Sequence, residues 1–331
     1  MNGWPEDYGS AHTLGAPVEL QGIGLHSGSQ ARVRLEPAEL PGFRIGWLDG
    51  SDRSLHRLDP AQVADTQLCT ALQIDQRRLA TVEHLLAALA GVGLSQVTIL
   101  VEGHEIPLLD GSALPWVEAI AAAGLKHLGP RPALQVLAGP ITLQQGLSFA
   151  TALPSDRPRI GAAIAFSQPA IGQQFFSLEL TPQAFVEQIA PARTFGFRDQ
   201  IEQLRASGLI QGGGLDNALV CDGDHWLNPP LRFHDEPVRH KLLDLLGDLA
   251  LVGLPQAQVF AYRGSHGLHT ALAAALARLR PVPFPADALD RFRRPGACPS
   301  SWFLLFLDVQ CPCRWGRDFR RGGDPGRGPD V

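Results

Sequence analysis

Lysine and methionine are almost absent from this chain, and cysteine is sparse. Lys126 and Lys241 are the only lysines among 28 Lys and Arg residues, and Met1 is the single methionine of the 331 residues. The five cysteines are irregularly spaced, which does not match a disulfide framework, so we expect reduced thiols. Almost every basic side chain is arginine, so a lysine at any position is an exception to the composition of the chain.

A strong charge and a long apolar run are also lacking. The formal net charge is -5, without the clustered Lys and Arg typical of nucleic-acid binders, so we expect no nucleic-acid partner. No apolar run approaches the roughly 20 residues that span a bilayer. The first residues, MNGWPEDYGS, lack the basic and then hydrophobic segments of a signal peptide. We therefore expect no transmembrane segment and a cytoplasmic location.

The composition is that of a folded protein, with 45% hydrophobic and 18% charged residues. Because about 100–200 residues per domain is usual, we expect two domains. The Pro- and Gly-containing stretch 128–132 marks the boundary, so we assign 1–128 to an N-terminal α+β domain and 133–281 to a C-terminal one. The segment 282–331 is rich in Pro and Gly and is expected to be an irregular tail.

Both halves mix strand-like and helix-like segments. Alternating or β-branched patterns predict strands at 17–20, 31–35, 43–47, 96–101, 133–137, 147–153, 160–165, 175–180 and 258–262. Helices are predicted at 82–90, where Thr81 is the expected cap, and at 115–123, 182–190, 198–207, 237–252 and 268–279. The segments do not alternate as in a parallel βαβ sheet, so we expect a layered α+β fold with two α/β-sandwich domains.

The helix predicted at 237–252 carries a polar stripe. His240, Asp244 and Asp248 stand four residues apart, and residues at this spacing share a helix face. The surrounding leucines indicate a buried helix, in which an imidazole and two carboxylates must pair or bind a cation. The stripe predicts either a satisfied His–Asp hydrogen bond or part of a metal site.

A second candidate group opens the helix predicted at 82–90. His84, combined with His240 and Asp244, would supply two nitrogen ligands and one oxygen ligand, which is the make-up of a catalytic zinc site with an open position. Zinc lowers the pKa of a bound water to about 7, and the carboxylate of Glu83 could take its proton. Spacing alone does not bring two distant helices together, so the metal site and the structural alternative both remain open.

Several segments carry a family resemblance. They are GIGLHSG (22–28), DTQLCT (65–70), TVEHLLAAL (81–89), EIPLLDGSA (105–113), ARTFGF (192–197) and VRHKLLDLLGDL (238–249). In this order they closely resemble the UDP-3-O-acyl-N-acetylglucosamine deacetylase family, zinc amidases that commit Gram-negative bacteria to lipid A synthesis. The resemblance covers roughly residues 12–280 and leaves the tail outside it.

The resemblance implies a role for each matching residue. His84, His240 and Asp244 match the Zn²⁺ ligands, and Glu83 matches the general base. His266 matches the histidine that protonates the leaving amine or stabilises the oxyanion, and Asp248 matches the carboxylate that orients it. Thr194 matches a hydroxyl that helps to hold the oxyanion, while Phe195 and Lys241 match residues that contact the nucleotide sugar. The implied substrate is a small molecule, an acylated UDP-N-acetylglucosamine, which is hydrolysed at its N-acetyl amide.

The chain departs from the family pattern before the last histidine. It has Gly264-Ser265-His266 where Ser-Gly-His is usual, and a second histidine, His269, follows. Two alternatives to the zinc deacetylase therefore stay open: an inactive homologue that binds nucleotide sugars or acyl chains, and a non-haem iron oxygenase, which also uses two histidines and one carboxylate. Nothing in the sequence predicts an oligomer or the length of the acyl chain.

Overall fold

The computed structural model of the chain describes residues 3–49, 54–131 and 137–279, all of which fall within one compact unit, Met1–Phe284. The predicted tail and most of the strand predicted at 133–137 lie outside the described residues. Within them, helices and several separate sheets are mixed, which confirms the predicted α+β class. No helix of this described part is both long and apolar enough to cross a membrane.

The first half of the chain builds a five-stranded sheet with the order β2-β3-β9-β4-β5. Its strands are β2 (Val18–Ile23), β3 (Gln30–Pro37), β4 (Gly42–Trp47), β5 (His56–Arg57) and β9 (Gln96–Glu102). Neighbours are antiparallel except β4 and β9, which are parallel. Ala31, Val33 and Leu35 alternate with more exposed residues along β3, so one face of this sheet points into the core.

The second half builds another five-stranded sheet, β11-β12-β18-β13-β14. Its strands are β11 (Ile141–Gln145), β12 (Ser148–Pro154), β13 (Arg159–Ala165), β14 (Gln173–Glu179) and β18 (Ala257–Tyr262). Here the one parallel pair among the neighbours is β13 and β18. Numbered in chain order, the strands of both sheets read 1-2-5-3-4, and the parallel pair joins the fifth strand to the third. This repeat is not among the sequence-based predictions.

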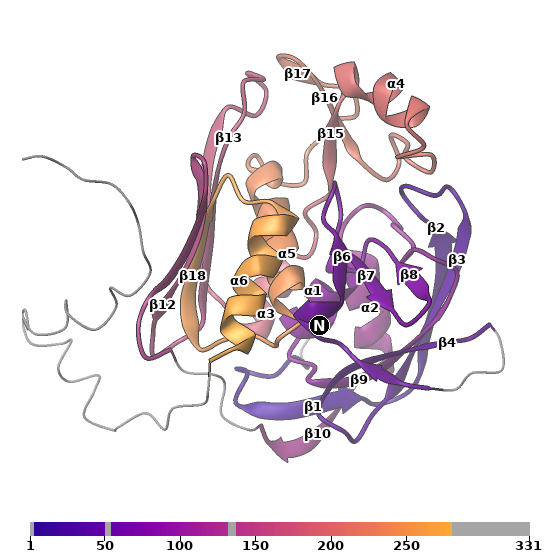
Figure 1. The fold of residues 1–331 in the computed structure, drawn as a ribbon, viewed down its shortest axis with the longest axis vertical. Coiled ribbons are helices and arrows are strands. Elements are labelled where there is room, and N and C mark those ends of the chain that lie inside the picture. Colours follow the sequence, from indigo (N-terminus) through magenta and orange to yellow (C-terminus); the bar gives the residue numbers. More distant parts are fainter. Residues whose placement is uncertain (1–2, 50–53, 132–136, 280–331) are drawn as a thin grey trace, which may run out of the picture. The chain divides into compact units, whose positions relative to one another are not determined.

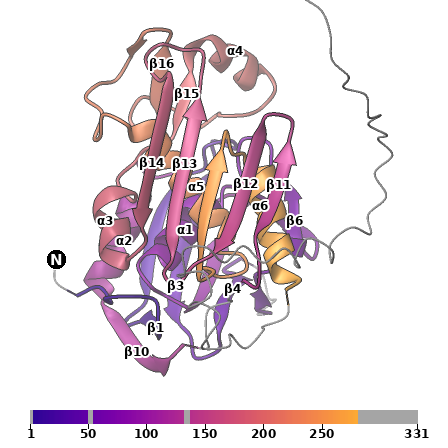
Figure 2. The ribbon, with the colours of Figure 1, turned by 90° about the vertical axis from the view of Figure 1, so that its left-hand side faces the viewer.

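Each half also places one helix immediately before its fifth strand and one after it. These are α1 (Glu83–Gly91) and α2 (Leu114–Ala123) in the first half, and α5 (Glu236–Leu249) and α6 (His266–Ala277) in the second. The helices lie between the two sheets (Figure 1). The helices α5 and α6 contact the second sheet, α2 contacts β2, and α1 packs against α5. Figure 2 shows the second sheet in front of α5 and α6. All nine residues of α1 are buried, so the polar side chains in its first turn, Glu83 and His84, are enclosed.

Smaller elements surround this core. They are the two-stranded sheet of β1 (Ser10–Leu14) and β10 (Leu125–Pro130), the sheet of β6 (Val63–Asp65), β7 (Ala71–Ile74) and β8 (Arg77–Leu79), the sheet of β15 (Phe195–Phe197), β16 (Leu219–Asp222) and β17 (His225–Trp226), and the helices α3 (Pro182–Gln188) and α4 (Arg198–Ala206). A short 3₁₀ helix covers Pro60–Gln62. The stretch 128–132, taken as a boundary, begins within β10, because Leu125–Pro130 pairs with β1.

The predicted helices agree with the observed ones to within a few residues, with one error in capping. Thr81 does not cap α1: its backbone has a φ of 57°, and its hydroxyl donates to Glu105 Oε1 at 2.8 Å. The N-cap residue is Val82, which makes no side-chain cap. The helix predicted from 268 begins instead at His266, because the side chain of Ser265 accepts the N–H of Leu268 as its cap.

Candidate metal centre

The two helices α1 and α5 bring together the residues that sequence spacing could not unite. His84 comes from the first turn of α1, and His240 and Asp244 lie one turn apart on α5. Ligand atoms of the three residues lie within 4.8 Å of one another, and all three side chains are buried. The Nε2 atoms of His240 and His84 lie 3.3 Å and 3.7 Å from Asp244 Oδ1.

The charges of these three groups suit a cation. Burial, together with the nearby imidazole of His240, lowers the pKa of His84 to about 3. Burial also lowers the pKa of His240. Burial opposes the charge of Asp244, but Lys241 and the histidines hold the pKa of this carboxyl well below its usual value. At neutral pH the cluster therefore contains two neutral imidazoles and one carboxylate.

The hydrogen bonding of His240 suits a cation beside its second ring nitrogen. Its Nδ1 lies 3.0 Å from the carbonyl oxygen of Ala192, which can only accept, so Nδ1 carries the ring proton. Its Nε2 then directs a lone pair toward Asp244 Oδ1, and two acceptors face each other at 3.3 Å. Donation of the second ring nitrogen to a backbone carbonyl is the usual support of a metal-bound histidine. The donor set therefore fits a zinc ion.

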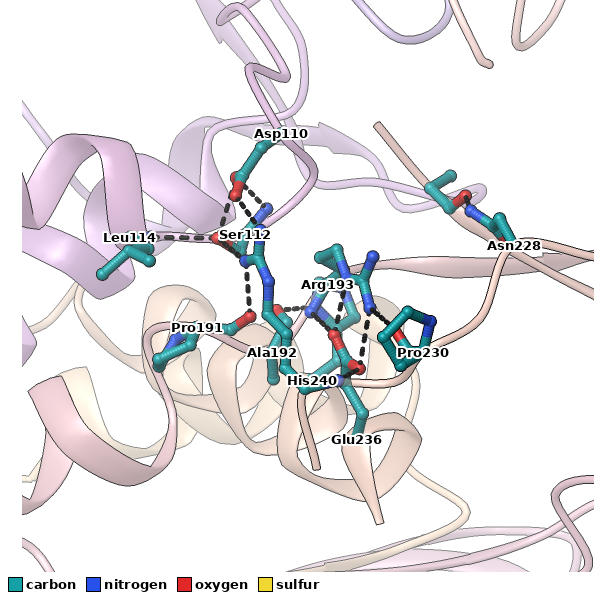
Figure 3. A network of polar contacts seen from close by, with 12 residues as sticks. Asp110, Ser112, Leu114, Pro191, Ala192, Arg193, Asn228, Pro230, Glu236 and His240 are labelled. Carbon is teal, nitrogen blue, oxygen red and sulfur yellow. Dashed lines mark hydrogen bonds and ion pairs between the residues drawn. The ribbon is translucent and has the colours of Figure 1, made fainter. Parts of the chain in front are cut away.

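A network around Glu236 fixes the carbonyl that orients His240 (Figure 3). Glu236 is fully buried in the first turn of α5, and its carboxylate accepts from the backbone N–H and the guanidinium of Arg193 and from the N–H of Arg232. Arg193 follows Ala192 directly. Glu236 thus ties the segment before β15 to the same helix that carries His240 and Asp244.

Arg232 extends this network to the turn at Asp110-Gly111. Its guanidinium donates to Asp110 Oδ2 at 2.7 Å and to the carbonyl of Pro191 at 2.8 Å. Gly111 has a φ of 85° and donates to the carbonyl of Leu108, which closes the turn. The carbonyl of Gly111 accepts the N–H of Thr194 at 2.8 Å. These bonds fix the backbone of Thr194, one of the predicted site residues.

Glu83, Asp248 and His266 form an acid–base group beside the ligand cluster. Burial raises the pKa of Glu83 to about 7. His266 Nδ1 lies 3.0 Å from Asp248 Oδ2, and its Nε2 lies 4.0 Å from Asp244 Oδ2. Burial alone would lower the pKa of His266, but the carboxylates of Asp248 and Glu83 outweigh it and raise the pKa to about 9. A base and a protonated imidazole therefore border the same three ligands.

Two further residues reach Asp248 and were not predicted to do so. The hydroxyl of Thr70 donates to Asp248 Oδ1, and His269 Nδ1 lies 3.1 Å from Asp248 Oδ2. Thr70 ends the DTQLCT segment, and His269 follows His266 by three residues, so the sequence marks both positions without indicating these contacts. Asp248 lies far from Thr70 in the sequence, so the contact between these two residues becomes visible only in the folded structure.

Lys241 and Phe195 lie at the edge of the cluster. Lys241 Nζ donates to Asp244 Oδ2 at 2.8 Å and lies 5.8 Å from the centre of the Phe195 ring. Phe195 in turn meets the ring of His240 edge-on. Burial opposes the charge of Lys241, yet Asp244 raises its pKa above the usual value, so the ammonium stays charged. With 26% of its side chain exposed, Lys241 is a cation at the border between the cluster and the surface.

Cys69 and His26, which lie in the family motifs DTQLCT and GIGLHSG, are both buried. Burial raises the pKa of the Cys69 thiol to about 12, so it is a core residue rather than a nucleophile. His26 follows β2 in the turn to β3, where its backbone N–H donates to Glu105 at 2.8 Å. Neither residue belongs to the ligand cluster.

Comparison with known proteins agrees with this geometry. A model of the UDP-3-O-acyl N-acetylglycosamine deacetylase family matches residues 11–278. A UDP-3-O-acyl-N-acetylglucosamine deacetylase from Thermosynechococcus vestitus is 48% identical over 271 residues, which is 81% of this chain and 94% of the relative. The protein of the same name from Synechocystis sp. is 47% identical over 270 residues, or 80% and 98% of the two chains. A probable deacetylase of this type from Arabidopsis thaliana, named mitochondrial, is 40% identical over 292 residues, or 80% and 87%.

Proposed function

The chain belongs to the UDP-3-O-acyl N-acetylglycosamine deacetylase family, and we propose that His84, His240 and Asp244 hold its catalytic zinc ion. The protein is a deacetylase of lipid A synthesis that hydrolyses the N-acetyl group of UDP-3-O-acyl-N-acetylglucosamine to give acetate and the free amine. The observation that carries the zinc proposal is the pair of facing acceptors, His240 Nε2 and Asp244 Oδ1, which together with His84 offer a cation three buried ligand atoms.

We assign the two proton transfers of the reaction to two residues beside the ligand cluster, Glu83 and His266. A zinc ion at the three ligands supplies a Lewis acid for the amide carbonyl and lowers the pKa of water. Glu83, whose pKa of about 7 suits a general base, takes the proton of the attacking water. His266, whose pKa of about 9 keeps it protonated, donates to the glucosamine nitrogen as the C–N bond breaks. Asp248 fixes the ring orientation of His266 through the 3.0 Å bond to Nδ1.

Three further residues are proposed to contact the substrate. Thr194 donates its hydroxyl to the oxyanion that develops at the amide carbonyl, and the backbone bond to Gly111 supports this role by holding the segment still. Lys241 is a point charge for a phosphate of the UDP group, and Phe195 offers an aromatic face beside it.

The decisive experiment measures acetate release and metal content on the same purified protein. We expect stoichiometric zinc and release of acetate from UDP-3-O-acyl-N-acetylglucosamine, while Glu83→Gln should retain the metal and lose most of the turnover. Zinc without acetate release from the wild-type protein would instead establish an inactive binding homologue. Turnover that required oxygen would favour an iron oxygenase, although His240 and Asp244 share helix α5, whereas the ligands of that class usually lie on sheet strands.

We also propose that 1–128 and 133–281 are two domains with the zinc site at their interface. The shared strand order of the two five-stranded sheets supports this division, and the proposed ligands come from both halves. We also propose a cytoplasmic location in a Gram-negative bacterium, which differs from the compartment in the name of the Arabidopsis relative. Fractionation of the source cells tests it.

A further inference from the structure

We propose that Thr70 is a positioning residue that holds both carboxylates flanking the metal ligands. Its backbone N–H donates to Glu83 Oε2 at 3.0 Å, and its hydroxyl donates to Asp248 Oδ1. Thr70 is fully buried, so neither bond competes with solvent. The inference rests on the proposed function, since it matters for catalysis only if Glu83 and the Asp248–His266 pair carry out the proton transfers.

The bond to Asp248 is needed because the other oxygen of that carboxylate is shared. Oδ2 lies 3.0 Å from His266 Nδ1 and 3.1 Å from His269 Nδ1. Rotation of an aspartate carboxylate about its last torsion meets only a soft barrier. A donor on Oδ1 opposes this rotation and keeps Oδ2 directed at the two rings. The Thr70 hydroxyl therefore fixes the orientation of His266 indirectly, through the carboxylate of Asp248.

Thr70 itself is held firmly. Its carbonyl accepts the N–H of Val82 at 3.3 Å, which joins it to the start of α1, and the next residue, Ala71, begins β7. The side chain of threonine is β-branched and has few rotamers, so its hydroxyl direction follows from the backbone. Substitution of the side chain removes the bond to Asp248 and leaves the backbone bond to Glu83 in place. The two carboxylates can thus be tested separately.

The test compares Thr70→Val and Thr70→Ser in the zinc-loaded full-length protein, with kcat, KM, zinc content and melting temperature measured for each. Thr70→Val should lower kcat by about tenfold to 100-fold, because the lost bond is to a charged group. KM and the zinc stoichiometry should stay unchanged. Thr70→Ser, which keeps the hydroxyl, should restore most of kcat, and Thr70→Ala gives a second measure of the lost hydroxyl without an added methyl group. Thr13→Val is a matched control, because Thr13 is equally buried and accepts the N–H of Ala38 far from the site.

A double-mutant comparison of Thr70 and Asp248 distinguishes the positioning role of Thr70 from a role in stability alone. In an Asp248→Ala background the hydroxyl has no carboxylate to hold, so adding Thr70→Val should not lower kcat further. Independent effects of the two substitutions, or loss of zinc in Thr70→Val, would overturn the inference. If Thr70→Val turned over normally while His266→Ala was slow, the inference alone would fail. If the wild-type protein released no acetate, the proposed function would fail and take the inference with it.

Discussion

Gly247 is the residue on which the closeness of α1 and α5 depends. It lies in α5 between Asp244 and Asp248, and a Cβ atom added to it would lie 2.7 Å from the carbonyl carbon and 2.9 Å from the Cα of Glu83, with the carbonyl oxygen closer still. These are backbone atoms at the start of α1 and cannot rotate away. Gly247→Ala must therefore push apart the two helices that carry the proposed ligands.

Whether Gly247→Ala raises or lowers the free energy of unfolding shows which effect dominates, helix propensity or the close contact with α1. In an open helix, replacing Gly by Ala would stabilise by about 1 kcal/mol. Overpacking of a buried contact costs about 1–3 kcal/mol, and a rigid backbone neighbour favours the upper end. We expect Gly247→Ala to destabilise by about 2 kcal/mol net, which lowers the melting temperature by about 3 °C for a folded unit of this size.

Calorimetry of the purified variants measures this shift, and zinc titration measures its consequence. We expect weaker zinc binding in Gly247→Ala, because moving α1 changes the 3.7 Å separation of His84 and Asp244. Gly139→Ala is the control, since a Cβ there would meet nothing within 4 Å and the backbone has no positive φ. A melting temperature of Gly247→Ala equal to or above that of the wild type would refute the close approach of the helices.

Three further predictions test the proposed roles in the site. His84→Ala should lose zinc and acetate release together in metal analysis and a product assay; a normal zinc content would contradict its assignment as a ligand. His266→Ala should keep zinc but lower kcat by about 10²- to 10⁴-fold, as expected for a lost proton donor, and an unchanged rate would remove it from the mechanism. Lys241→Arg should raise KM by about tenfold and change kcat less, because a planar guanidinium cannot replace a compact ammonium 2.8 Å from Asp244. An unaltered KM would argue against a phosphate contact.

The helices were the most predictable part of the fold. The leucine- and alanine-rich segments at 82–90 and 237–252 have strong local signals, and α1 and α5 cover nearly the same residues. Short edge strands such as β5 and β17 have two residues each, too few for a pattern to appear. The false capping role of Thr81 shows the limit of local rules, because a tertiary bond to Glu105 holds its hydroxyl instead.

The candidate site was predictable only in pieces. The spacing of His240, Asp244 and Asp248 on one helix face is a local property, and the structure shows them buried on α5 as expected. Their meeting with His84 depends on helix packing over a long sequence separation, and the family resemblance indicated it where periodicity could not. Glu236 and Thr70 were missed because each acts through a backbone or carboxylate partner that is distant in sequence. A glycine inside a leucine-rich helix, Gly247, is a local sign of a close helix contact.

The repeated topology explains why the cluster forms where it does. In each half a helix enters immediately before the fifth strand of its sheet, and these equivalent helices, α1 and α5, are the two that pack together. The first half supplies Glu83 and His84 and the second supplies His240, Asp244 and Asp248, so neither half alone contains all three proposed zinc ligands. Two facing helices also place polar groups from both sides in an enclosed layer between the sheets, where the imidazoles stay neutral and the carboxylate stays charged. Metal binding should therefore depend on the packing of the two halves, and a substitution at the α1–α5 contact should weaken it without touching a ligand.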